Sequence, residues 1–106
     1  MISLIEDNRE GIEQLCRQFH VARLEVFGSA ANGEFDPEKS DVDFLVEFEP
    51  NYSLGPWLSR YFELKSQFEA MLGRQVDLVM SGAIKNALFA GAVNQTRRLL
   101  YAQKNA

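Results

Sequence analysis

Two aspartates, Asp41 and Asp43, lie two residues apart in the most strand-like segment of the sequence, residues 41–49. Alternate residues of a β-strand face the same side, so both carboxylates leave the sheet together, with their α-carbons about 7 Å apart. A third acid, Asp77, lies within the short apolar segment 76–79. Acids are rarely found in such a segment without a partner. If the two strands pair, three carboxylates meet at one point.

Carboxylates crowded in this way repel one another and need protonation or a counter-charge. Hard divalent cations bind oxygen ligands, and two such ions about 4 Å apart can hold both the attacking and the leaving oxygen of a phosphoryl transfer. We therefore expect Asp41, Asp43 and Asp77 to bind Mg²⁺. Without Asp77, the other two would be interpreted as ordinary solvated charges on a strand.

A second group able to bind phosphate is the Gly28-Ser29 pair, which follows a short predicted strand over 24–27. Glycine allows the backbone to approach a phosphate closely, and Ser29 offers a hydroxyl and an N–H at the start of a turn or helix. The metals and this loop would bracket one triphosphate. If the metal cluster is wrong, the pair is only a turn.

The elements that must position these groups are read from hydrophobic periodicity and turn signals. Segment 41–49 places Val42, Phe44, Val46 and Phe48 on one face, which we expect to be the core face. The tail 97–101 fits either a helix or a terminal strand. The remaining expected elements are a helix over 3–20, a strand over 24–27, a loop over 30–40, a helix from about 58 that stops at Gly73, a strand over 75–80 and a helix from about 84. This order predicts an α+β (mixed α/β) fold, a small mixed sheet with helices packed mainly on one side.

Length and composition limit the class of protein. The 106 residues, 46% of them hydrophobic, predict a single domain over 1–106. A formal net charge of −4 argues against direct binding to nucleic acid, which needs clustered Lys and Arg. The single Cys16 cannot form an internal disulfide, and no apolar run approaches the roughly 20 residues of a membrane span. We expect a cytoplasmic protein without membrane contact.

Three motifs in order carry a family resemblance: Gly28-Ser29, then the run from Ser40 to Val46 (SDVDFLV), then residues 76–79 (VDLV). Together they resemble the nucleotidyltransferase superfamily that includes DNA polymerase beta, and specifically its minimal, stand-alone members, the MNT proteins. The resemblance covers nearly the whole chain. It implies the nucleotidyltransferase fold.

The resemblance also implies roles for these residues. Asp41, Asp43 and Asp77 would hold two Mg²⁺ ions and assist attack of a hydroxyl on the α-phosphate of ATP. Gly28, Ser29 and Ser40 would bind the nucleotide. Minimal members are commonly paired with HEPN ribonuclease toxins as antitoxins, and some transfer AMP from ATP to a toxin tyrosine. A HEPN toxin in a hetero-oligomer is thus the implied partner.

One departure from the family pattern leaves an alternative open. Close relatives usually carry Arg directly after the Gly-Ser pair and again two residues later, where this chain has Ala30 and Asn32. The charge could be supplied by Lys39 or Arg74, or the chain could be a weak or inactive enzyme that neutralises its toxin by binding alone. Transfer to a small molecule would usually need a further substrate-binding domain.

The sequence contains other residues with chemical potential, for which we expect ordinary structural roles. His20 is interpreted as a charge at a helix C-terminus, and Cys16 as a core residue. The aromatic stripe of Trp57, Tyr61 and Phe62 is interpreted as internal packing rather than a partner-binding patch. The default for Arg97 and Arg98 is a solvated pair.

Overall fold

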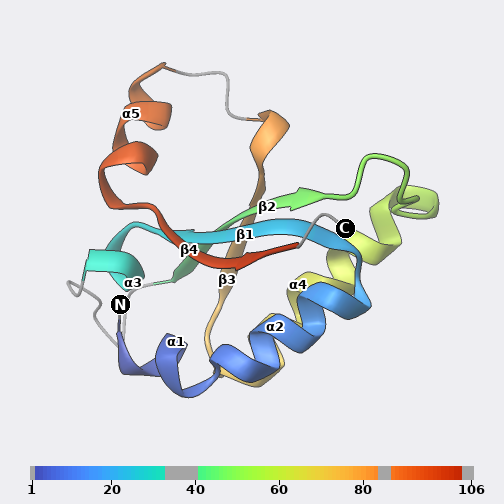
Figure 1. The fold of residues 1–106 in the computed structure, drawn as a ribbon, viewed down its shortest axis with the longest axis horizontal. Helices are drawn as coiled ribbons and strands as arrows, with labels where there is room; N and C mark the ends of the chain where they lie inside the picture. The colour runs from blue at the N-terminus through green and yellow to red at the C-terminus, as the bar shows by residue number, and fades with distance from the viewer. Residues whose placement is uncertain (1, 33–40, 84–86, 104–106) are drawn as a thin grey trace.

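A mixed β-sheet forms the centre of the molecule (Figure 1). The computed structural model describes residues 2–32, 41–83 and 87–103, and within these ranges the sheet has the strand order β3-β2-β1-β4. Strand β1 pairs antiparallel with both β2 and β4, whereas β2 and β3 are parallel. The tail is a strand, not a continued helix, and the expected mixed sheet is confirmed. The strands are β1 (Val21–Phe27), β2 (Val42–Phe48), β3 (Val76–Met80) and β4 (Arg98–Ala102).

The helices follow the predicted order with one correction. The helix expected over 3–20 is broken at Asn8, whose side-chain amide donates to the Leu4 carbonyl at 2.8 Å. Such local bonding by Asn competes with the helical ladder. The helix before Gly73 ends there as expected, with Gly73 in the left-handed conformation at φ 65°. The helical elements are α1 (Ser3–Asp7), α2 (Arg9–Gln18), α3 (Ser29–Asn32), the 3₁₀ turn η1 (Pro56–Leu58), α4 (Ser59–Leu72), the 3₁₀ turn η2 (Ser81–Ala83) and α5 (Ala87–Thr96).

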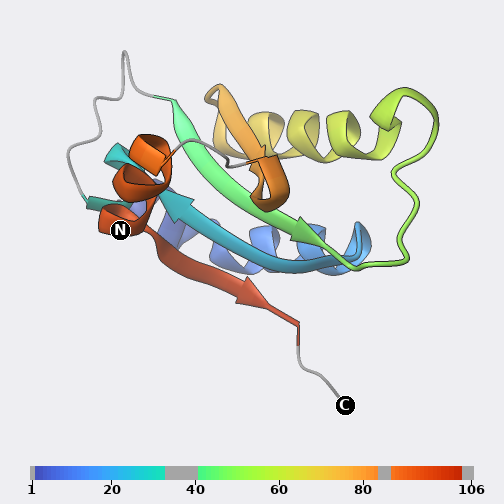
Figure 2. The same cartoon turned by 90° about the horizontal axis from the view of Figure 1, so that it is seen from above.

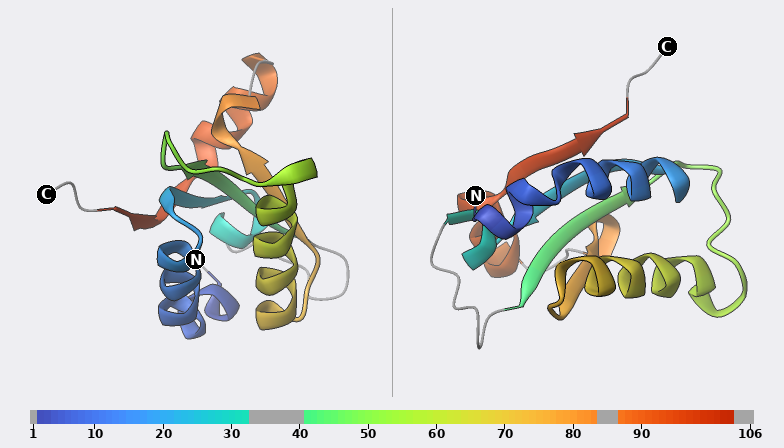
Figure 3. Two further views of the ribbon diagram at one scale, coloured as in Figure 1. Left: turned by 90° about the vertical axis from the view of Figure 1, so that its right-hand side faces the viewer. Right: turned by 90° about the horizontal axis from the view of Figure 1, so that it is seen from below.

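The main core lies between one face of the sheet and helices α2 and α4. Val42, Phe44 and Val46 are fully buried there, so the expected core face of β2 is confirmed. Phe44 packs against Phe68 of α4 with ring centroids 4.9 Å apart. Cys16 is also fully buried in this cluster, as expected. Figure 3 shows α2 and α4 together on this face of the sheet.

A smaller apolar cluster lies on the opposite face, beneath α5. It consists of Phe27, Leu45 and Val93, with Val79 packed against it. Figures 2 and 3 show α5 on this side, over the end of β1. The helices are therefore mainly on one side, as expected, and α5 alone among the described helices longer than one turn covers the face that also carries Asp43 and Asp77.

Of the aromatic stripe around the start of α4, Tyr61 packs against the main core and donates its hydroxyl to the Leu78 carbonyl, whereas Trp57 and Phe62 do not form internal packing. Trp57 is 94% exposed and Phe62 is 54% exposed, and only Tyr61 is half-buried. The interpretation as internal packing is therefore confirmed for Tyr61 and wrong for Trp57 and Phe62. At Trp57 the reason is the 3₁₀ turn, which holds both Trp57 and Leu58 at φ 56°. Within the described ranges, no helix is both long enough and apolar enough to cross a bilayer.

Candidate active site

The three predicted acids lie at one end of the sheet, where β2 and β3 begin. Asp43 of β2 and Asp77 of β3 are direct partners in the parallel register, and neighbouring strands are about 4.8 Å apart. Asp41 is exposed and immediately precedes β2, where the N–H of the next residue, Val42, donates to the Gln75 carbonyl at 3.0 Å. The structure thus brings Asp41, Asp43 and Asp77 to the starts of two adjacent parallel strands.

The carboxylates interact electrostatically. Partial burial raises the pKa of Asp43 to about 6, and the negative charges of Asp77 and then Asp41 add to this shift. Crowding of like charges in a partly desolvated place is the arrangement in which a bound cation is most favourable.

The carboxylate oxygens of this cluster are the ligand type that a hard divalent cation prefers. Among the described residues, no three His, Cys, Asp or Glu side chains converge as a ready-made metal site. Asp43 and Asp77 provide oxygen ligands on directly opposite positions of β2 and β3, and Asp41 immediately precedes β2. These residues could therefore hold Mg²⁺.

Gly28 lies against the same carboxylate. Its φ is +72°, and a β-carbon at this position would lie 2.6 Å from Asp43 Oδ2. Only glycine fits this conformation and this close approach without displacement. Ser29 begins α3, a helix of four residues, so it follows Gly28 at the same end of the sheet. Ser40, the third predicted nucleotide-binding residue, lies outside the described residues.

The sequence analysis missed two residues at this end of the sheet. The Thr96 hydroxyl oxygen accepts the N–H of Gly28 at 2.8 Å. Arg97, expected to be solvated, donates from two guanidinium nitrogens to Glu25. Glu25 is only 3% exposed, and its hydrogen bonds to Arg97 and then to Arg23 outweigh the cost of burial and lower its pKa to about 2. A Glu within the apolar run 24–27 was the signal in the sequence. Arg97 and Arg98 are both solvent-exposed, as expected, but the guanidinium of Arg97 is also paired with buried Glu25.

His20 is at the other end of the sheet. It follows α2 with φ 56°, and its Nδ1 lies 2.7 Å from Glu49 Oε2. The interpretation of His20 as a charge at a helix C-terminus is therefore incomplete, since its ring is also hydrogen-bonded to Glu49, 29 residues away in the sequence. His20 takes no part in the carboxylate cluster.

Of the two cations considered as substitutes for the loop arginines, Arg74 can be placed. It is half-buried in the connection between α4 and β3, next to Gln75, whose carbonyl binds the N–H of Val42. Arg74 therefore lies at the end of the sheet where β2 and β3 begin, near Asp41. Lys39 lies outside the described residues.

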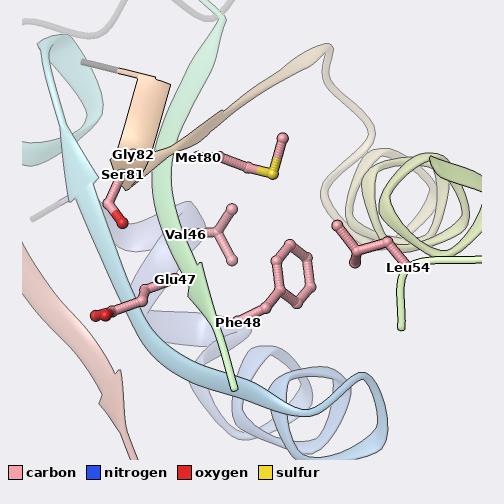
Figure 4. A pocket seen from close by; sticks show the side chains of 7 residues that line it. All are labelled: Val46, Glu47, Phe48, Leu54, Met80, Ser81 and Gly82. Carbon is pink, nitrogen blue, oxygen red and sulfur yellow. The ribbon is translucent and has the colours of Figure 1, made fainter. Parts of the chain in front are cut away.

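A separate apolar hollow of about 650 Å³ opens at the other end of β2 and β3 (Figure 4). Val46, Phe48, Leu54 and Met80 point into it. The three aspartates begin the strands whose ends line this hollow, so it is distinct from the carboxylate cluster.

Comparison with known proteins identifies consistent relatives. The family model for the nucleotidyltransferase domain matches residues 9–100. Protein adenylyltransferase MntA of Thermococcus cleftensis is 42% identical over 76 residues, 72% of each chain. A solved structure described provisionally as a minimal nucleotidyltransferase is 31% identical with a TM-score of 0.70, covering 89% of this chain and 90% of that chain.

Two toxin–antitoxin structures share the fold at lower identity. One, solved with AMP-PNP, matches with a TM-score of 0.69 at 22% identity, covering 92% of this chain and 75% of that chain. The other is a tri-AMPylated HEPN toxin of Shewanella oneidensis in complex with an MNT antitoxin, with a TM-score of 0.63 at 20% identity, covering 92% and 72%.

Proposed function

Because this chain belongs to the nucleotidyltransferase domain family, we propose that it is an antitoxin that transfers AMP from ATP to a tyrosine hydroxyl of a cognate HEPN toxin. The observation that carries the proposal is the register of Asp43 opposite Asp77, with Gly28 against the Asp43 carboxylate. A relative named as a protein adenylyltransferase supports the reaction. Toxin–antitoxin structures of the same fold, one with AMP-PNP and one with an AMPylated HEPN toxin, support the nucleotide and the partner.

In this proposal Asp41, Asp43 and Asp77 would hold two Mg²⁺ ions. Bound there, the ions would supply positive charge to offset the negative charge of the triphosphate during transfer. Gly28 and Ser29 are proposed to bind the β- and γ-phosphates from their place in the motif, at the same end of the sheet as the carboxylates. Ser40 is proposed as a further nucleotide contact from its place in the motif.

The reaction balances without another reactant. The tyrosine oxygen forms a bond to the α-phosphorus of ATP, the bond from that phosphorus to the bridging oxygen breaks, and pyrophosphate leaves. The hydroxyl proton passes to a carboxylate, for which we propose Asp77, an exposed acid directly opposite Asp43.

The test uses the purified chain with α-labelled ATP, Mg²⁺ and the HEPN protein encoded beside it. We expect label on the HEPN protein that requires Mg²⁺ and disappears in Asp43→Asn. Glu47→Gln is the matched control, since Glu47 is an exposed acid of the same strand, away from the cluster. Label that persists in Asp43→Asn would contradict the assignment of the carboxylates.

A second candidate function, inhibition of the toxin by binding alone, is favoured by one observation. Ala30 occupies a position where relatives of this type carry Arg, and it is completely buried. An arginine-poor loop would neutralise the triphosphate less well. A stable complex with the HEPN protein that forms without label, and equally well with Asp43→Asn, would support this alternative over transfer.

A further inference from the structure

The end of α5 and the residue that follows it make three contacts with β1 and with the residue that follows β1. Val93 is 2% exposed and packs against Phe27. Thr96 accepts the N–H of Gly28 through its hydroxyl oxygen at 2.8 Å. Arg97 pairs with Glu25. Figure 2 shows α5 lying over this end of β1.

Arg97 fixes the residue before it. Its Nε and Nη2 donate to the two oxygens of Glu25, and its Nη1 donates to Asn94 Oδ1 at 2.7 Å. Its own N–H bonds to the Val93 carbonyl at 2.9 Å. A two-point pair of this kind has a defined geometry. Moving Arg97 would leave the buried Glu25 charge without its strongest partner, which is costly. The backbone at Thr96 is thus held from both sides.

Through Thr96, this arrangement holds the backbone of Gly28. Gly28 lies one position past the end of β1, and its N–H is bound by a hydroxyl 68 residues away along the chain. Its α-carbon lies close to Asp43, since a β-carbon there would be 2.6 Å from Oδ2. A small displacement of Gly28 therefore changes the space between the loop and the carboxylate.

We propose that Thr96 is a positioning residue, which holds Gly28 at the distance from Asp43 that a metal-bound triphosphate requires, with Arg97 and Glu25 as its anchor. This inference rests on the proposed nucleotide reaction and extends it to the junction of α5 and β4. Thr96 acts through Gly28 and need not touch the nucleotide itself.

The experiment compares two substitutions at Thr96. Thr96→Val keeps the branched shape and removes the hydroxyl, whereas Thr96→Ser keeps the hydroxyl. The first readout is hydrogen exchange of the Gly28 amide by NMR without nucleotide, and the second is the Kd for ATP with Mg²⁺ by calorimetry. Asn8→Ala is the stability control, because it removes one partly buried side-chain hydrogen bond at the break between α1 and α2.

We expect Thr96→Val to increase exchange of the Gly28 amide about tenfold and to weaken ATP binding about five- to tenfold, the worth of one hydrogen bond. Thr96→Ser should stay within about twofold of the wild type in both. Asn8→Ala should lower the melting temperature without changing either value, which separates positioning from general stability.

Unchanged Gly28 exchange in Thr96→Val would overturn the inference, as would equal losses in Thr96→Val, Thr96→Ser and Asn8→Ala. Failure of the proposed function looks different: the wild type itself would bind no ATP with Mg²⁺. In that case the role of Thr96 in nucleotide binding is overturned too. The exchange rate of the Gly28 amide in Thr96→Val still shows whether Thr96 holds the loop.

Discussion

Asp43 and Asp77 are directly opposite each other on adjacent parallel strands. Partial burial and the charges of Asp77 and Asp41 raise the pKa of Asp43 from its ordinary 3.8 to about 6. The folded protein therefore binds this proton more tightly than the unfolded chain does. The contribution of Asp43 to the free energy of unfolding therefore falls as the pH rises from about 3.8 to about 6, and the loss persists above pH 6.

Replacing Asp43 with Asn should accordingly stabilise the metal-free protein at pH 7.5. We expect a gain of about 1–2 kcal/mol in the free energy of unfolding, reduced from the full shift because the side chain is partly solvated. Little gain is expected at pH 3.5, where the native carboxyl is already protonated. Urea unfolding at both pH values measures the difference, with Glu47→Gln as the control. An Asp43→Asn protein no more stable than the wild type at pH 7.5 would contradict the crowding.

Magnesium should reverse this destabilisation. A cation binds the deprotonated carboxylates of the folded state, so Mg²⁺ at ten times its Kd should stabilise the wild type by about 1.4 kcal/mol at pH 7.5. The effect should shrink at pH 5.0, because protons then compete for Asp43. Thermal unfolding with and without Mg²⁺ gives the shift. A shift of the same size in Asp43→Asn would show that the ion binds elsewhere.

Gly28 cannot accept a side chain without cost. Gly28→Ala combines a φ of +72° with a β-carbon 2.6 Å from Asp43 Oδ2, so we expect a loss of about 1–3 kcal/mol in the free energy of unfolding. It should also abolish Mg²⁺-dependent ATP binding, because Asp43 has to move. Gly91→Ala in α5 is the matched control: its β-carbon would meet nothing within 4 Å, and alanine favours the helix. Equal stability of the two variants in denaturant unfolding would contradict the contact.

The sequence predicted that Asp43 and Asp77 lie on neighbouring strands, and it predicted those strands, because both inferences rest on local patterns. The alternation along β2 placed Asp43 opposite the core face, and Gly28 marked the end of β1. The pairing of Arg97 with Glu25 and the bond from Gly28 to Thr96 were not predictable in the same way. Each joins residues about 70 positions apart, and nothing in the neighbouring residues specifies the partner. The outward turn at Trp57 was missed because the spacing of the aromatic residues is helical, whereas the backbone at Trp57 and Leu58 is not α-helical.

The ion pair between buried Glu25 and exposed Arg97 should stabilise the fold at neutral pH. Because the pKa of Glu25 is lowered to about 2, its stabilisation is fully present above its ordinary value of 4.5 and is lost as the pH falls towards 2. Glu25→Gln should cost about 1–2 kcal/mol at pH 7, because it removes the charge that accepts hydrogen bonds from Arg97 and Arg23, while both arginines stay partly hydrated. The gap from the wild type should narrow at pH 2.5. Urea unfolding at both pH values tests this, and an equal loss in exposed Glu47→Gln would contradict it.

Cys16 should be chemically silent in the folded protein. It is fully buried, and burial, together with the nearby charge of Glu13, raises the pKa of its thiol to about 12. The thiolate is the reactive form, so both its small population and its inaccessibility slow attack on a disulfide reagent such as DTNB. We expect modification at pH 8 to be at least about a hundredfold slower in buffer than in concentrated urea, and to proceed only through opening of α2 from the sheet. Since opening limits the reaction, a destabilising substitution such as Glu25→Gln should accelerate it and Mg²⁺ should slow it. Labelling in buffer as fast as in urea would mean that α2 does not pack against β1 in solution as the core requires.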